Sequence, residues 1–179
     1  MKNRGITLIE VLIVVALLLG GLVPLVKMII EGLRGTQIMG SITVANSLAQ
    51  SLLEEIKQRK WDENAPQKGV YIPTTSASDT LGPDSGENQN YRYTLDDIDD
   101  YDDLDDNPIK DESGAVLTEY ANKYKRSVVV EYVNVPLGGT VTVETGTKTD
   151  YKRVKVTVEI IGENRSVTQS VILANGTFY

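Results

Sequence analysis

The chain has 179 residues, a formal net charge of −7, and neither His nor Cys. Without these two residue types it lacks the usual catalytic triads, zinc sites and thiol nucleophiles. The sequence also contains neither a phosphate-binding loop nor a nucleophile elbow, so we expect the protein not to be an enzyme. We likewise expect no nucleic-acid partner.

The N-terminal segment is strongly apolar. Val11–Val26 carries no charge, and counting back to Ile6 gives 21 residues interrupted only by Thr7 and Glu10. A helix of this length extends roughly 30 Å, enough to cross the hydrocarbon core of a bilayer. A carboxylate at the centre of such a helix costs about 2.5–3.5 kcal/mol on insertion scales, and it usually has a partner and a role. Glu10 is therefore a candidate functional residue.

The segment could instead be a secretory signal peptide, which would end in small residues at a cleavage site after its apolar core. Gly20-Gly21 is a weak candidate for that site, but the apolar pattern resumes after it. Cleavage between Gly5 and Ile6 would place a new amino group about one helical turn from Glu10. An acid in the first turn also complements the helix dipole. The alternative interpretation of Glu10 is an acid near the membrane edge that extends its carboxylate to water.

The run Arg4-Gly5-Ile6-Thr7-Leu8-Ile9-Glu10-Val11 resembles the prepilin signal of type IV pilins and of the pseudopilins of type II secretion. The resemblance implies that a membrane peptidase cuts after Gly5 and releases residues 1–5 as a leader. It also implies that the new amine of Ile6 is methylated, although the family usually has Phe there. Glu10 would then neutralise the N-terminus of a neighbouring subunit as the filament grows.

The same resemblance implies partners and a location. The partners are other pilin subunits, the prepilin peptidase, the inner-membrane assembly platform and, before assembly, membrane lipid. The location is the bacterial inner membrane, with a single membrane-spanning helix and a periplasmic globular domain, followed by a filament at the cell surface.

Beyond the membrane segment, apolar residues continue at alternating steps of four and three, as on one face of a helix. These residues are Ile38, Ile42, Ala45, Ala49, Leu52 and Ile56. The pattern predicts a helix from Ile6 to about Arg59, with a membrane half at 6–26 and an amphipathic segment at 27–64.

Gly20, Gly21 and Pro24 are the expected weak points of this helix. Proline removes one backbone hydrogen bond and clashes with the preceding turn, so we expect a kink or local melting at 20–24. The resemblance implies that melting there accompanies assembly. The alternative is an ordinary membrane-helix proline that is supported by its neighbours.

A second resemblance covers Ala45–Asn64, which ends in Trp61-Asp62-Glu63-Asn64. This segment is similar to the end of the helix in minor pilins of the mannose-sensitive haemagglutinin type. Trp61 is the only Trp, and we predict that it anchors the helix end on the following domain.

Residues 65–179 are expected to form one globular domain that begins with a long loop at Ala65–Asn90. Alternating patterns then predict strands, with a short hairpin loop at Gly162–Arg165 before the last one. The predicted strands are Tyr91–Leu95, Arg126–Val135, Arg153–Ile161 and Ser166–Ala174, with a shorter candidate at Thr140–Glu144. The expected fold class is α+β, with the helix packed on an antiparallel sheet as in the type IV pilin fold that the resemblance implies.

Eight Asp residues lie within 96–106. Asp103, Asp105 and Asn107 share the alternate spacing that begins a helix–loop–helix calcium site, but Pro108 and Gly114 occupy the positions of its required Gly and closing Glu. Because charge runs are usually solvated, the sequence favours a solvated acidic loop over a calcium site. We therefore expect no cofactor.

Three functional hypotheses follow. The first is a minor pilin of a type IV pilus, used for adhesion, motility or surface attachment. The second is a minor pseudopilin of a type II secretion system. The third is a membrane-anchored module with an uncleaved helix, whose Asp run binds cations or a basic partner.

Overall fold

The structure is a computed structural model that describes residues 7–77 and 80–176. The chain divides into two units, Met1–Ser41 and Ile42–Tyr179. Helix α1 (Leu8–Lys57) begins in the first unit and ends in the second.

The first unit is the N-terminal part of α1. The carbonyl of Thr7 accepts hydrogen bonds from the backbone amides of Glu10 at 3.1 Å and Val11 at 3.2 Å, and these bonds begin the helix. The helix is unbroken through residues 20–24, and Pro24 lies inside it. The chain by itself thus shows no melted turn here, and melting during assembly stays a prediction.

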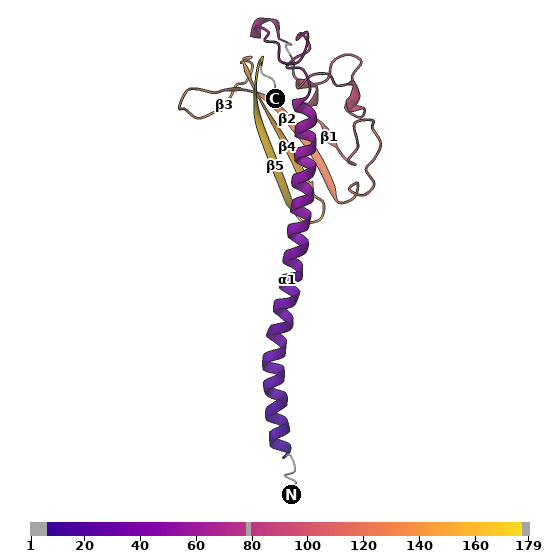
Figure 1. Cartoon of the computed structure of the whole chain (residues 1–179), viewed down its shortest axis with the longest axis vertical. Helices are drawn as coiled ribbons and strands as arrows, with labels where there is room; N and C mark the ends of the chain where they lie inside the picture. Colours follow the sequence, from indigo (N-terminus) through magenta and orange to yellow (C-terminus); the bar gives the residue numbers. More distant parts are fainter. Residues whose placement is uncertain (1–6, 78–79, 177–179) are drawn as a thin grey trace. The chain divides into compact units, whose positions relative to one another are not determined.

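The second unit contains an antiparallel sheet with strand order β1-β2-β4-β5, and a short strand, β3, pairs with the end of β2 (Figure 1). The strands are β1 (Asp105–Asp106), β2 (Tyr124–Asn134), β3 (Thr142–Val143), β4 (Tyr151–Ile160) and β5 (Arg165–Ala174). In the described residues, three 3₁₀ turns lie between α1 and β1: η1 (Thr74–Ser76), η2 (Arg92–Thr94) and η3 (Asp99–Tyr101).

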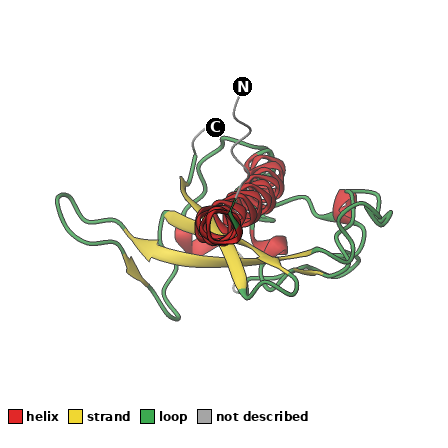
Figure 2. Cartoon of the chain, turned by 90° about the horizontal axis from the view of Figure 1, so that it is seen from below, coloured by secondary structure: helices red, strands yellow, loops and turns green. Residues whose placement is uncertain are grey.

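The end of α1 lies on one face of this sheet (Figure 2). Its buried side chains are Ala45, Leu48, Ala49, Leu52, Leu53 and Ile56, which include four of the six residues of the predicted apolar face. In β4, Val154, Val156 and Val158 are fully buried and alternate with more exposed polar residues. The predicted α+β architecture, a long helix packed on an antiparallel sheet, is confirmed, as are its three long strands.

The strand predicted at Tyr91–Leu95 is wrong, because η2 occupies this segment. Tyr91 and Tyr93 are 48% and 63% exposed, whereas Arg92 is buried, which reverses the expected alternation. Backbone hydrogen bonds from Thr94 to Tyr91 and from Leu95 to Arg92 close this turn, and the Arg92 side chain pairs with Glu55 of α1. The helix also ends at Lys57, before the predicted Arg59, and residues 58–64 are not helical.

The prediction of a solvated acidic loop at 96–106 is wrong for half of its Asp residues. Asp97, Asp99, Asp100 and Asp106 are at most 2% exposed. Burial is tolerated because backbone amides and cations surround the carboxylates: Lys152 pairs with Asp99, and Arg126 pairs with Asp106. Asp103 and Asp105 remain exposed, as expected.

Candidate functional site: the apolar half of helix α1

The first unit exposes large apolar side chains on all sides of the helix. They include Leu8, Ile9, Val11, Leu12, Leu17, Leu18, Leu22, Val23, Leu25, Met28 and Leu33. By length and composition alone, α1 could cross a membrane. The apolar stretch on which this statement rests contains no buried residue. A helix that is apolar all round is stable only when lipid or other protein covers it. We therefore expect lipid or other protein to cover this segment.

Glu10 lies in the first turn of α1 and is exposed among apolar neighbours. Within residues 7–77 and 80–176, no ion pair involves its carboxylate. Once lipid or protein covers the helix, a carboxylate here requires a cation supplied from elsewhere. Gly5 and Ile6, the predicted sites of cleavage and methylation, lie outside the described residues.

Residues 1–19 match the family model of the prokaryotic N-terminal methylation motif. This match indicates a pilin-like or pseudopilin precursor that prepilin peptidase processes and that assembles with other pilin subunits. Motif and fold together favour a structural subunit over an enzyme, and they favour membrane anchoring before assembly. No curated protein and no solved structure matches the chain.

In the second unit, Trp61 holds the chain just after the helix end, as predicted. Its side chain is 5% exposed and belongs to the main hydrophobic core. The Lys152 ammonium lies 4.8 Å from the centroid of the Trp61 ring and donates a hydrogen bond of 2.7 Å to the Trp61 carbonyl. Both the ring and the backbone of Trp61 therefore connect the helix end to β4.

Buried ion pairs make a second connection between α1 and the globular domain. Glu55 of α1 accepts hydrogen bonds from Arg92 Nε at 2.9 Å, from Arg92 Nη2 at 3.2 Å and from the Tyr101 hydroxyl at 3.0 Å. Arg126 of β2 donates to Asp106, whose carboxylate also lies 3.6 Å from Arg92. The two guanidinium groups thus share Asp106, and the network joins the helix to β1 and β2.

The sequence interpretation missed these buried cations, although the strands contain a signal for them. Arg126 is in phase with the buried Val128 and Val130 of β2, and Lys152 is in phase with the buried valines of β4. Because alternate residues of a strand face the same side, extending each pattern by two residues would have placed both cations in the core.

Among the residues that the structure describes, two clusters of carboxylate oxygens combine Asp residues of 96–106 with a Glu from elsewhere, and the atoms of each cluster lie within 4.8 Å of one another. They are Glu63, Asp96 and Asp97, and Glu87, Asp96 and Asp100. Burial and the neighbouring Glu87 raise the pKa of Asp100 to about 8. Neither cluster contains Asp103 or Asp105, the weak calcium candidates of the sequence.

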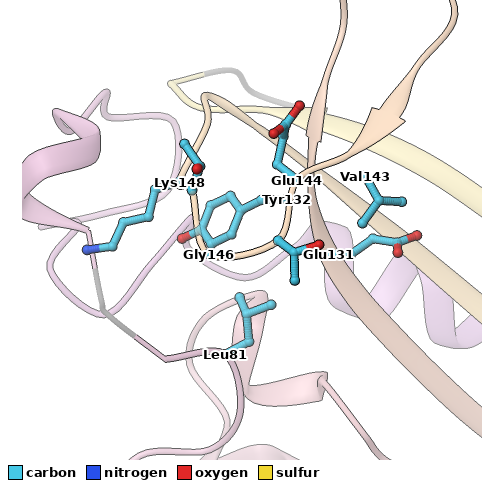
Figure 3. A pocket seen from close by; sticks show the side chains of 9 residues that line it. Leu81, Glu131, Tyr132, Val143, Glu144, Gly146 and Lys148 are labelled. Atoms are coloured by element: carbon cyan, nitrogen blue, oxygen red, sulfur yellow. The ribbon is translucent and has the colours of Figure 1, made fainter.

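A cavity of about 420 Å³ lies beside β2 and β3 and is lined by Leu81, Tyr132, Val143 and Glu144, among others (Figure 3). Two of its charged side chains are already engaged by the fold. Glu131 pairs with Arg153 and Lys155, and Lys148 donates a hydrogen bond of 2.8 Å to the Ala77 carbonyl. We assign this cavity no function.

Proposed function

We propose that the protein is a minor pilin of the mannose-sensitive haemagglutinin type, which is cut after Gly5 and incorporated into a type IV pilus. One observation carries the proposal: a prepilin-type motif at residues 1–19 continues into a helix whose exposed surface is apolar on all sides. Such a surface suits two successive environments, the bilayer before assembly and the packed helices of neighbouring subunits afterwards.

Glu10 is the assembly residue in this proposal. Its carboxylate pairs with the N-terminal amine of an adjacent subunit, an amine that exists only after cleavage between Gly5 and Ile6. In a helix core of low dielectric, the pair neutralises two charges that would each be costly alone. The globular domain faces the periplasm before assembly and the filament surface afterwards.

The second unit supports this role by its firm connection to α1. Trp61 packs in the core just after the helix end, and Glu55 forms an ion pair with Arg92. A subunit that is held in a filament by its helix requires such connections, because any force on the domain passes through them.

Mass spectrometry of the N-terminal peptide of the full chain from membranes tests the proposal. We expect a peptide that begins at Ile6 and carries one methyl group. An N-terminus at Met1 would contradict cleavage and would favour the membrane-anchored module. Because a pseudopilin is processed in the same way, the presence of the subunit in sheared surface filaments separates the pilin from the pseudopilin hypothesis.

A further inference from the structure

Lys152 is a fully buried cation surrounded by carboxyl groups. Its side chain is 0% exposed, and its Nζ lies 2.7 Å from Asp99 Oδ1 and 3.9 Å from Asp62 Oδ2. The aromatic rings of Trp61 and Tyr132 lie 4.8 Å and 5.4 Å from the same nitrogen. The structure thus holds an amine against a carboxyl group, away from bulk water and beside aromatic rings.

The Asp99 carboxyl has a second carboxyl group beside it. Asp97 Oδ1 accepts a hydrogen bond of 3.0 Å from the backbone amide of Asp99, and both residues are at most 2% exposed. Burial and the adjacent Asp99 charge raise the pKa of Asp97 to about 10, so Asp97 carries a proton at neutral pH. A protonated acid next to a carboxyl group is positioned for proton transfer during a reaction at that group.

The surroundings favour a neutral product. Desolvation penalises the charged forms of both Lys152 and Asp99, and a buried ion pair recovers this penalty only in part. An amide between the two side chains would carry no charge. An amine that is hydrogen-bonded to one carboxyl oxygen also lies close to the carboxyl carbon that it would attack, which removes most of the entropic cost of bringing the two groups together.

We propose that Lys152 and Asp99 condense into an intramolecular isopeptide bond, with Asp97 transferring the protons. Proton transfer within the pair first gives a neutral amine and a neutral acid. The Nζ lone pair then forms a bond to Asp99 Cγ, and the carbonyl electrons move to oxygen. Asp97 takes one proton from the nitrogen and gives one to the departing hydroxyl, so the C–O bond breaks, one water leaves and Asp97 ends unchanged.

The bond would close a covalent ring between residues separated by 53 positions. It would join β4 to η3, and Lys152 also contacts Trp61 after the helix end. A cross-link of this kind limits the freedom of the unfolded chain, as a disulfide does, in a protein that has no Cys. The proposal does not depend on the role of the protein in a filament.

Tryptic digestion and mass spectrometry of the unfolded full chain test the proposal. We expect a branched peptide that joins the segments containing Asp99 and Lys152, lighter by one water than the two segments together. Trypsin should not cut after Lys152, because the side chain is acylated. Two separate peptides, with cleavage after Lys152, would overturn the proposal whatever the variants show.

Variants then test the role of each residue. Lys152→Met and Asp99→Ala should abolish the branched peptide, and Asp97→Asn should slow its formation at least about 100-fold, the usual contribution of proton transfer. Lys155→Met is the matched control, because Lys155 also lies 2.9 Å from a carboxylate, that of Glu131, but more than a third of its side chain is exposed. This variant should keep the branched peptide. An unchanged rate in Asp97→Asn would show that Asp97 does not transfer the protons.

Discussion

Arg92 donates hydrogen bonds from two nitrogens to the Glu55 carboxylate, and this contact connects helix α1 to η2. The Nε–Oε1 distance is 2.9 Å and the Nη2–Oε2 distance is 3.2 Å, and only 3% of the Arg92 side chain is exposed. Forked contacts between a guanidinium and a carboxylate combine charge with fixed geometry. Because Arg92 lies 37 residues from Glu55 along the chain, the contact forms only when the domain folds onto the helix.

Glu55→Ala should destabilise the protein by about 2 kcal/mol or more, because it leaves the buried Arg92 without its closest carboxylate. The measurement is urea unfolding of the full chain in detergent, monitored by circular dichroism. Glu54→Ala is the matched control: Glu54 pairs with Lys57 at 2.9 Å, but 54% of its side chain is exposed. We expect its effect to stay below about 0.5 kcal/mol. Equal effects of the two substitutions would contradict the importance of the Arg92 contact.

Glu10→Ala should leave cleavage after Gly5 largely intact and impair incorporation into filaments, since the partner of the neighbouring amine is lost. Immunoblots of membrane and sheared-filament fractions measure both effects. Glu31→Ala provides the control, because Glu31 is an exposed acid farther along the same helix. Normal filament incorporation of the Glu10→Ala subunit would rule out the pairing role.

Stability should decline as pH rises, and Asp100 contributes to this decline together with Asp97. The pKa of Asp100 is raised from 3.8 to about 8 by burial and by Glu87, so the folded chain binds more protons than the unfolded chain between these values. The resulting stabilisation is complete below about pH 3.8 and is lost as pH rises through about 8.

Asp100→Asn should reduce this decline, because the amide does not titrate. Its oxygen can still accept the hydrogen bonds that the backbone amides of Asp96 and Asp97 donate. Melting temperatures measured between pH 5 and pH 9 test the prediction. Asp103→Asn is the control, since Asp103 is exposed and Asn tolerates its φ of 56°. A pH profile unchanged by Asp100→Asn would show that another group titrates.

Calcium should leave the melting temperature unchanged at millimolar concentration if, as the sequence favours, Asp103 and Asp105 are solvated residues rather than ligands. Differential scanning fluorimetry of the full chain in detergent, with magnesium as a control, measures this. A shift that disappears in a variant with Ala at both positions would instead establish a calcium site there. A shift that persists in this variant would place the bound cation elsewhere.

Local patterns in the sequence were sufficient to predict which face of a single helix or strand is buried. The apolar face at Ala45, Ala49, Leu52 and Ile56 predicted which side of the helix the sheet covers, and alternation in β4 predicted its buried valines. The motif around Glu10 was recognisable in the same way, because it is continuous in sequence and its chemistry depends on close neighbours.

The positions of the charged groups depended on tertiary structure. Read as a run, residues 96–106 look solvated, but Lys152 and Arg126 approach from strands β4 and β2 and make burial of Asp99 and Asp106 favourable. Arg92 is likewise buried by its contact with the distant Glu55, in a segment that forms η2 and not the predicted strand. Sequence alone determined the helix, the long strands of the sheet and the N-terminal motif. Only the folded chain determined which charges lie inside, because the burial of a charge depends on partners that are distant in sequence.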